Sequence, residues 1–335
     1  MNPFRLVRPR SLADAHAVLG ADPRGTTIRA GGVDLMDRWK EGIDRPATVL
    51  DLRTAAAAED ARALASLSAT ATSLAVGALV TLDALAETPL PAAFAAVRAA
   101  AGQAANPAIR RQATAGGNLL QRPRCWYFRH PDLACLKKGG SRCLAAEGNN
   151  RYNAVLGGGP SYIVHPSSLA TALVAFDGHA VVQASPGRPK EIPLGEFFVG
   201  PTERLDAETV LRPGEILLGV RVSAPAGARS AYDAVRERRL YDWPLVEAAV
   251  RLRVEAATLR DVRVVLGQVA PIPWRAREAE AVLEGRRPTP ERLAEAARAA
   301  FEGARPLSDN HGKIAVGRGL VRRLLHQVTG VPLPA

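Results

Sequence analysis

Two glycine pairs stand in similar stretches of the sequence, Ala30-Gly31-Gly32-Val33-Asp34-Leu35 and Thr114-Ala115-Gly116-Gly117-Asn118-Leu119. Glycine lets the backbone adopt a positive φ or approach another group closely. Successive N–H groups in such a turn form a cradle for an anion, and the N-terminus of a following helix adds its dipole. A lone Gly-Gly pair is usually an ordinary tight turn, but two such loops from different segments could hold a pyrophosphate from both sides.

The residues around the first pair predict a β–turn–α–β unit with the glycines in its first turn. Residues 26–29 have the composition of a short strand, residues 35–40 have helical periodicity, and residues 47–52 are an apolar strand. Ser11 is a good N-cap for a helix that we expect to end at Gly20. No Gly-x-Gly-x-x-Gly follows a strand in the sequence, so the Rossmann dinucleotide-binding fold is not supported.

The remaining patterns predict an α+β chain in three parts. Strand patterns occupy residues 66–79, 179–183 and 215–222, and helical patterns occupy residues 81–87, 91–102 and 167–176. A polar, cysteine-bearing insertion lies at about 121–154. After a linker at 225–227, two strand patterns (246–254 and 259–269) precede three helical ones (275–284, 290–301 and 313–328). We therefore expect domains at 1–55, 56–225 and 226–335.

The composition is that of an ordinary soluble protein, because 47% of the 335 residues are hydrophobic and 23% are charged. No stretch of the sequence approaches the roughly 20 apolar residues that span a bilayer. Residues 1–10 are basic but lack the apolar segment of a secretory signal. We therefore expect no membrane span and a cytoplasmic or periplasmic location, with no signal of the chain's own.

The net charge of +11 comes from 44 basic and 33 acidic residues that are spread thinly along the chain. A basic surface suits nucleic acid, an acidic protein partner or an anionic cofactor. The sequence has no basic tail, zinc-finger spacing or aromatic-rich RNA-binding signature. We expect no nucleic-acid binding, and a protein partner instead.

The three cysteines, Cys125, Cys135 and Cys143, all fall in the polar insertion. An odd number excludes a fully paired set of intrachain disulfides. Clustered thiols in an otherwise cysteine-free chain are typical of metal or iron–sulfur ligation. Three reduced structural cysteines are the simpler alternative, because buried free cysteine is common.

Both glycine loops resemble the FAD loops of the medium subunits of the xanthine dehydrogenase and carbon monoxide dehydrogenase family of molybdenum hydroxylases. The resemblance continues, in the same order along the chain, through residues 76–81, 211–216, 235–238, 266–270 and 273–275. It implies an α+β fold with two FAD-binding subdomains of the vanillyl-alcohol-oxidase (PCMH) type. It also implies a C-terminal α+β domain like that of carbon monoxide dehydrogenase flavoproteins.

The resemblance further implies a set of cofactor contacts and a place in electron transfer. The residues that it implies as FAD contacts are Arg29, Ala30, Gly31, Gly32, Val33, Asp34, Leu35, Thr114, Ala115, Gly116, Gly117, Asn118, Gln121 and His165. It implies no catalytic residue in this chain. The implied partners are a large molybdopterin-binding subunit, which oxidises an aldehyde, and a small [2Fe–2S] subunit. Electrons would pass through the small subunit to FAD and then to an external acceptor.

Within the family, the cysteine-bearing insertion is most similar to that of the FAD subunit of periplasmic-type aldehyde oxidoreductases. In those relatives it holds a [4Fe–4S] cluster, and three of the ligands map onto Cys125, Cys135 and Cys143. The fourth cysteine falls where this chain has Ser161-Tyr162. The cluster would then need a ligand such as the Ser161 alkoxide, which is harder than a thiolate, or be a three-iron form, or be absent.

Several single residues have both a functional and a structural interpretation. Ser168 stands where the relatives have an aspartate near the FAD adenosine or ribose, but it could simply cap a helix. His165 could approach the flavin or the cluster, or be a satisfied structural histidine. Lys313 matches a family lysine, and a solvated helix lysine fits equally well. Trp243 and Trp274 are more typical of packing than of stacking on a cofactor.

Two other functions fit parts of the pattern. One is a stand-alone FAD oxidase of the vanillyl-alcohol type, which needs its own base beside the flavin, and the six scattered histidines offer no convincing candidate. The other is a non-catalytic iron–sulfur assembly or binding protein, which a colourless, flavin-free preparation would favour.

Overall fold

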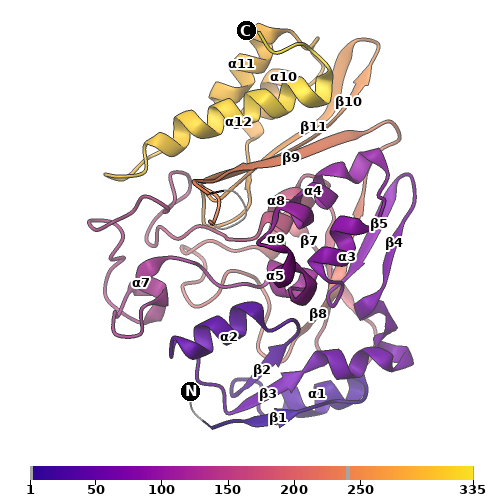
Figure 1. Cartoon of the computed structure of the whole chain (residues 1–335), viewed down its shortest axis with the longest axis vertical. Helices are drawn as coiled ribbons and strands as arrows, with labels where there is room; N and C mark the ends of the chain where they lie inside the picture. The colour runs from indigo at the N-terminus through magenta and orange to yellow at the C-terminus, as the bar shows by residue number, and fades with distance from the viewer. Residues whose placement is uncertain (1–2, 239–241, 335) are drawn as a thin grey trace.

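The computed structural model describes residues 3–238 and 242–334. Within them the chain forms three β-sheets, each from a separate stretch of sequence (Figure 1). The first sheet is parallel and has the order β1 (Arg5–Val7), β3 (Thr48–Asp51), β2 (Thr26–Arg29). Because parallel strands need crossover connections, helices α1 (Leu12–Ala21) and α2 (Val33–Lys40) join them.

The second sheet is antiparallel. Its order is β4 (Leu67–Ala69), β5 (Ser73–Gly77), β8 (Ile216–Ser223), β6 (His179–Gln183), β7 (Lys190–Pro193). The long connection from β5 to β6 contains six short helices: α3 (Leu82–Glu87), α4 (Ala95–Gln103), α5 (Pro107–Gln112), α6 (Ala115–Leu119), α7 (Trp126–Arg129) and α8 (Ser168–Val174). Helix α9 (Leu194–Phe197) follows β7, and 3-10 turns lie at Leu52–Ala57, Glu59–Ala65, Ala92–Phe94 and Leu136–Lys138.

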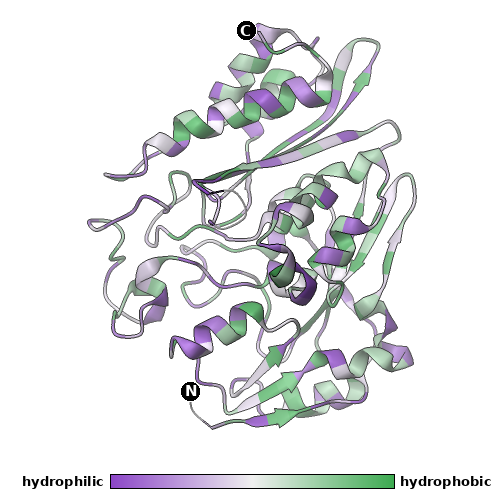
Figure 2. Ribbon diagram, in the orientation of Figure 1, coloured by the Kyte–Doolittle hydropathy of each residue, from purple (hydrophilic) through white to green (hydrophobic). Residues whose placement is uncertain are grey.

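The third sheet is also antiparallel, in the order β12 (Trp274–Arg275), β11 (Thr258–Gly267), β10 (Val246–Glu255), β9 (Arg229–Val235). Three helices pack against it: α10 (Arg277–Leu283), α11 (Pro290–Ala299) and α12 (Gly312–Thr329) (Figure 1). Helix α12 alternates hydrophobic and hydrophilic segments in Figure 2, as expected for a helix with one face against a sheet.

Buried apolar side chains connect the three sheets. One cluster runs from Leu50 in the first sheet through Leu74 in the second and reaches Val265 in the third. A second cluster fills the space between the third sheet and its helices, for example with Val250 and Leu324. Burial of each such side chain is worth about 1.5–3 kcal/mol relative to exposure. Because the first cluster crosses all three sheets, packing fixes their relative positions.

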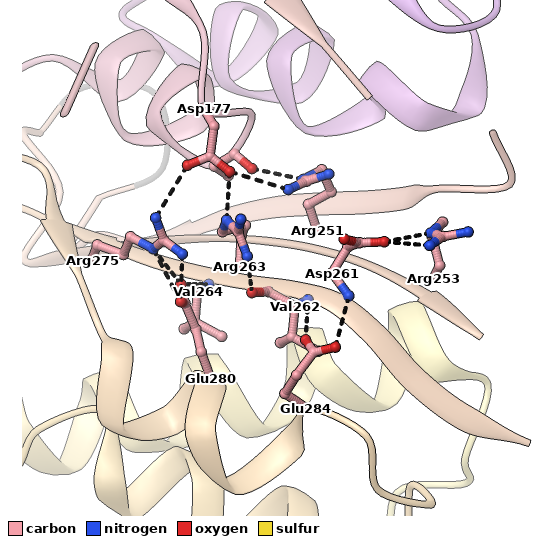
Figure 3. A network of polar contacts seen from close by, with 11 residues as sticks. Asp177, Arg251, Arg253, Asp261, Val262, Arg263, Val264, Arg275, Glu280 and Glu284 are labelled. Atoms are coloured by element: carbon pink, nitrogen blue, oxygen red, sulfur yellow. Dashed lines mark hydrogen bonds and ion pairs between the residues drawn. The ribbon is translucent and has the colours of Figure 1, made fainter. Parts of the chain in front are cut away.

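Polar contacts add a second connection, between the end of α8 and the third sheet (Figure 3). Asp177, which follows α8, accepts hydrogen bonds from Arg263 Nε at 2.6 Å and from Arg275 Nη1 at 3.1 Å. The buried Arg251 donates from Nε to Ala175 O at 2.7 Å. These contacts hold the C-terminal end of α8 against β10, β11 and β12.

The local sequence signals are confirmed in part. Strands β2 and β6 have the predicted bounds, and Ser11 caps α1 because its Oγ accepts from Asp14 N at 3.0 Å. The predicted end of this helix is wrong, since Gly20 lies inside it. The helix ends where Asp22 leaves helical geometry and accepts a hydrogen bond from Gly25 N at 2.9 Å.

Residues 225–227 form a tight turn and not a linker. Ala228 N donates to Pro225 O at 3.1 Å, and Gly227 has φ +77°. The turn leads into β9, which was not predicted because buried and partly buried residues follow one another there without alternation. In the part of the chain that the structure describes, no helix is both long and apolar enough to cross a membrane.

Candidate functional site

A cavity of about 540 Å³ lies between the two glycine loops, and this volume is typical of cofactor sites. Its walls come from segments that are far apart in the sequence. They come from the stretches 28–38 and 104–124, Leu52, Ala78, Leu79, Leu82, Pro166, Ser168, residues 215–217, Arg236 and residues 242–244. Strands β2 and β8, the α5–α6 region and the connection between β9 and β10 therefore all contribute to one site.

Most of the predicted cofactor contacts line this cavity. They are Arg29, Ala30, Gly31, Gly32, Val33, Asp34, Leu35, Thr114, Gly116, Gly117, Asn118 and Gln121. The structure does not place Ala115 in the lining. Its side chain is buried, and its N–H donates to Val80 O at 2.8 Å. The glycines of the second loop therefore line the cavity, whereas this alanine does not.

His165 also lies outside the cavity lining. Its ring is buried and packs edge-on against Phe198, with 4.7 Å between the ring centroids. Burial lowers the pKa of His165 to about 3. The imidazole is therefore neutral at physiological pH. Its Nδ1 accepts from Ser167 N at 3.4 Å, and its buried Nε2 has no hydrogen-bond partner among the described residues.

The first glycine loop presents free backbone donors. Gly32 is the N-cap of α2 with φ +77°, and no side chain caps this helix. Within the described chain, no protein group accepts a hydrogen bond from the backbone N–H groups of residues 31–35. The first N–H groups of a helix have no intrahelical partner. These N–H groups are therefore available in the cavity wall, and a helix N-terminus of this kind favours an anion.

The second glycine loop does not present such donors, and here the prediction is wrong. Gly116 N donates to Ala78 O at 2.8 Å, Gly117 N to Thr114 Oγ1 at 3.1 Å, and Asn118 N to Thr114 O at 2.8 Å. Thr114 is the N-cap of α6 and satisfies its first turn internally. The second loop therefore contributes surface to the cavity but no free N–H groups from residues 116–118.

The two loops also pack against each other. Gln112, at the end of α5, donates from Nε2 to Gly31 O at 3.1 Å. A Cβ added to Gly31 would lie 2.0 Å from Gln112 O, and one added to Gly116 would lie 2.8 Å from Ala78 Cβ. The first glycine of each pair is therefore required for close packing of backbone.

Asp34 ties the first loop to the cysteine-bearing segment. Its carboxylate lies 3.0 Å from Arg38 Nε, 3.1 Å from Arg124 Nη2 and 2.7 Å from Arg129 Nη2. It also accepts from Arg122 N at 3.1 Å. Burial alone would raise the pKa of Asp34, but the surrounding arginine charges hold it below its usual value. The carboxylate is therefore ionised and fixes both segments at the cavity.

Arg236 and Trp243 line the cavity but were not predicted as cofactor contacts, whereas Ser168 was considered as one from the family resemblance. Arg236 and Trp243 reach the cavity from the third sheet and the segment after it, and Trp243 stacks with Arg124 at 4.5 Å from guanidinium carbon to ring centroid. Trp243 is 43% exposed, so it is not the packing residue that the sequence suggested. Ser168 lines the cavity as well, while Ser167 is the N-cap of α8. Nothing in the local sequence of Arg236 and Trp243 marks them as cofactor contacts.

Two other residues named in the sequence analysis are structural. Lys313 is buried, and its Nζ donates to Tyr152 O, Asn153 O and Gln268 O at 2.7–3.0 Å. Burial lowers the pKa of Lys313 to about 7. It is therefore not a solvated helix lysine. Trp274 packs on Gly157, where an added Cβ would lie 2.7 Å from the ring.

One of the three cysteines, Cys143, contacts the segment that contains Ser161, and Cys125 contacts Asn153. Tyr162 N donates to Cys143 Sγ at 3.5 Å, and Asn153 Nδ2 lies 3.7 Å from Cys125 Sγ. Burial raises the pKa of Cys125, and the nearby Cys143 adds to this effect. Cys135 is buried. Over residues 3–238 and 242–334, no three His, Cys, Asp or Glu side chains are grouped as metal ligands.

Comparison with known proteins covers the chain from end to end. The family of the FAD-binding domain in molybdopterin dehydrogenase matches residues 2–225, and the CO dehydrogenase flavoprotein C-terminal domain matches residues 230–329. The chain is 32% identical over 330 residues to the aldehyde oxidoreductase FAD-binding subunit PaoB of Escherichia coli K12, with 97% of this chain and 98% of PaoB covered.

Two further relatives agree. The nicotine 6-hydroxylase medium subunit of Paenarthrobacter nicotinovorans is 28% identical over 326 residues, with 97% of this chain and 95% of that subunit covered. A carbon monoxide dehydrogenase structure from Hydrogenophaga pseudoflava superposes with a TM-score of 0.74 at 23% identity, covering 98% of this chain and 99% of that one, which confirms the expected α+β fold. The chain therefore belongs to the family of FAD-binding medium subunits of molybdopterin-dependent oxidoreductases.

Proposed function

We propose that the first glycine loop holds the pyrophosphate of FAD and that the second loop forms the opposite wall of the site. The observation that carries this proposal is the row of unpartnered N–H groups at residues 31–35, at the N-terminus of α2. Phosphate oxygens are the ligands that such a helix N-terminus favours. Arg29 and Arg38 line the same cavity, where Arg29 is paired with Asp51 and Arg38 with Asp34 and Asp44.

The residues of the chain position and enclose FAD and do not react with it. Bound FAD supplies the capacity to accept and release electrons. Apolar side chains such as Ile28, Leu52 and Leu82 line the cavity and exclude water. Asn118 Oδ1 accepts from Ser167 Oγ at 2.6 Å, and Gln121 Nε2 donates to Pro166 O at 3.2 Å, so both amides have fixed orientations in the wall.

We further propose the arrangement of partners. A large molybdopterin-binding subunit would oxidise an aldehyde, and a small [2Fe–2S] subunit would pass the electrons to FAD in this chain. The similarity to PaoB over nearly the full length of both chains supports an aldehyde as the substrate class. One sheet in each of the spans 1–55, 56–225 and 226–335 supports the proposed domain bounds.

A [4Fe–4S] cluster in this chain is part of the proposal. Its ligands would be Cys125, Cys135 and Cys143, with Ser161 as the candidate for the fourth position. Donors already directed to the sulfurs of Cys125 and Cys143 support it, because hydrogen bonds to sulfur are typical of such clusters and tune their potentials. Ser161 is buried and precedes Tyr162, whose N–H contacts Cys143.

The decisive experiment is purification of the natural complex, followed by its absorption spectrum and quantification of flavin, iron and subunits. Flavin bands with two co-purifying subunits are the expected result. A flavin-loaded chain that purifies alone and oxidises substrate would instead establish the stand-alone oxidase. A colourless, flavin-free preparation would contradict both the FAD-subunit and the stand-alone oxidase interpretations.

The cluster is tested separately, by iron content and electron paramagnetic resonance of this chain. Cys143→Ser is expected to lower the iron content, whereas Ser141→Ala, in the same loop, is the matched control and should leave it unchanged. Flavin bands without iron would remove the cluster and leave the FAD proposal intact. Conversion of Ser161 to Cys would raise iron occupancy if position 161 is the fourth ligand.

A further inference from the structure

A carboxylate without a cationic partner is buried behind the wall of the FAD cavity. Glu247, in β10, is 0% exposed. Among the residues that the structure describes, it forms no ion pair. Ser168 donates a hydrogen bond from Oγ to Glu247 Oε1. Thr171 Oγ1 lies 3.3 Å from the other carboxylate oxygen and 3.2 Å from Ser167 O. A buried charge without a counter-ion destabilises the folded protein. The presence of Glu247 at this position therefore suggests a functional role.

The sheet makes room for this carboxylate. Gly267 of β11 is directly opposite Glu247 in the ladder. A Cβ at Gly267 would lie 2.6 Å from Glu247 Oε2 and 2.3 Å from Thr171 Oγ1. The absence of a side chain at residue 267 therefore allows the carboxylate to lie between the third sheet and α8.

Among the described residues, the hydroxyls of Ser168 and Thr171 contact Glu247, and the charge of Arg236 also acts on it. Burial raises the pKa of Glu247, while the hydrogen bond from Ser168 and the charge of Arg236 lower it. The buried Tyr232 hydroxyl of β9 is also near, and burial followed by the charge of Glu247 raises its pKa well above the usual value. Both Arg236 and Ser168 line the FAD cavity, so the cluster connects the carboxylate to the site.

The hydrogen-bonding capacity of Ser168 follows from this contact. A serine hydroxyl has one proton to donate and two lone pairs to accept with. The proton of Ser168 is donated to Glu247, so its oxygen offers only lone pairs to the cavity. A group of the ligand that meets Ser168 must then be a donor.

We propose that Glu247 is a positioning residue for FAD, which fixes Ser168 as the acceptor for a hydroxyl group of the cofactor. This inference rests on the proposed function and deepens it. Two parts of FAD carry such hydroxyls, the ribose of the adenosine half and the ribityl chain of the flavin half. Hydroxyl donation to Ser168 is the chemistry common to both.

The test is the FAD affinity of the full-length apoprotein, measured by flavin fluorescence. Ser168→Ala is expected to weaken binding roughly tenfold, since it removes the acceptor. Glu247→Met, which removes the carboxylate but keeps the side-chain length, should weaken it roughly fivefold. The double variant should bind no more weakly than Ser168→Ala alone, because Glu247 acts through Ser168.

Two further variants separate positioning from structural support. Glu247→Gln keeps an oxygen that accepts from Ser168, so it should bind FAD within about twofold of the unaltered protein. Thr171→Val removes the other hydroxyl beside Glu247 without altering the cavity lining, and should also leave affinity unchanged. Additive losses in the double variant, or unaltered binding by Glu247→Met, would overturn the proposal.

Probes that carry one half of FAD identify the hydroxyl. ADP carries the ribose, and FMN carries the ribityl chain. Ser168→Ala should weaken only one of them, and that half contains the donor. Equal weakening of both probes would indicate general damage to the site and would overturn the inference. This test uses Ser168→Ala, so it remains valid even if Glu247→Met does not fold. If the unaltered protein binds no FAD, the proposed function itself fails, and this inference fails with it.

Discussion

The two glycine loops are nearly alike in sequence, Ala-Gly-Gly-Val-Asp-Leu at 30–35 and Ala-Gly-Gly-Asn-Leu-Leu at 115–120, yet they differ in their hydrogen bonds. Gly32 of the first loop is left-handed and leaves the first turn of α2 uncapped. In the second loop Thr114 caps α6 with its side chain. The presence or absence of a capping side chain at the N-cap, Thr114 in the second loop and Gly32 in the first, therefore decides whether a loop has N–H groups to offer a ligand.

The loops nevertheless share one requirement. The first glycine of each pair lies against backbone or side chain of the neighbouring segment, Gly31 against Gln112 and Gly116 against Ala78. The second glycines differ, because Gly32 has φ +77° whereas Gly117 lies within α6. Substitutions at these positions should therefore separate packing from ligand binding.

The largest effect is expected at Gly31. Its Cβ would lie 2.0 Å from Gln112 O, a backbone atom that cannot move without shifting α5. Gly31→Val should destabilise the chain by more than about 4 kcal/mol, the range reserved for severe disruption of buried structure. Chemical denaturation measures this loss. An unchanged midpoint would show that the two loops do not pack as described.

The next largest effect on stability is expected at Asp34, because only the first loop contains a charged residue. Asp34→Asn leaves Arg38, Arg124 and Arg129 without their common carboxylate and should cost about 3 kcal/mol at neutral pH. The pKa of Asp34 is lowered from its usual 3.8 in the folded protein. The contribution of Asp34 to the free energy of unfolding is therefore complete above pH 3.8. It is lost as the pH falls through the lower pKa that Asp34 has in the folded protein.

Denaturation of Asp34→Asn and of the unaltered protein at several pH values checks this prediction. The difference in unfolding free energy should be constant at neutral pH and shrink in acid below pH 3.8. A difference that grows as the pH falls would contradict the sign of the pKa shift. Asn118→Ala in the second loop removes no charge and should show no such pH dependence.

Gly32→Ala is expected to have a moderate effect on stability and a specific effect on FAD. A left-handed alanine costs about 1–2 kcal/mol, and relaxation of the loop would misplace the N–H cradle. Gly42, which follows α2 with φ +73° and lies outside the cavity lining, is the matched control. Gly42→Ala should cost similar stability but retain FAD. Equal FAD retention by both variants would show that residues 31–35 do not hold the cofactor.

The smallest effects are expected in the second loop. Thr114→Val removes the cap of α6 and should cost about 1 kcal/mol. It frees the N–H of Gly117, so the loss of FAD should be smaller than the loss caused by Gly32→Ala. Gly117→Ala lies within a helix and should alter stability by less than about 1 kcal/mol. Thermal unfolding with and without added FAD measures the stability and the FAD binding of both variants. A loss of FAD larger than that of Gly32→Ala would reverse the roles of the loops.

Patterns in the sequence found most of the site but not its hydrogen bonds. Residues 30–35, which the family resemblance gave as FAD contacts, line the cavity, and the strand, glycine turn and helix expected there are present. His165 and Ala115 do not line the cavity, whereas their immediate neighbours Pro166 and Gly116 do. Arg236 and Trp243 were not foreseen as contacts, because their places depend on the third sheet.

The sequence by itself determined the local elements, the capping residues, the collinear family pattern and the positions at which only glycine fits. These depend on residues a few positions apart, where propensity and sterics act directly. Only the tertiary structure decided which N–H groups remain free, that Asp34 joins three arginines, and that Glu247 lies behind Ser168. Such facts depend on partners from distant segments, which packing of the three sheets brings together.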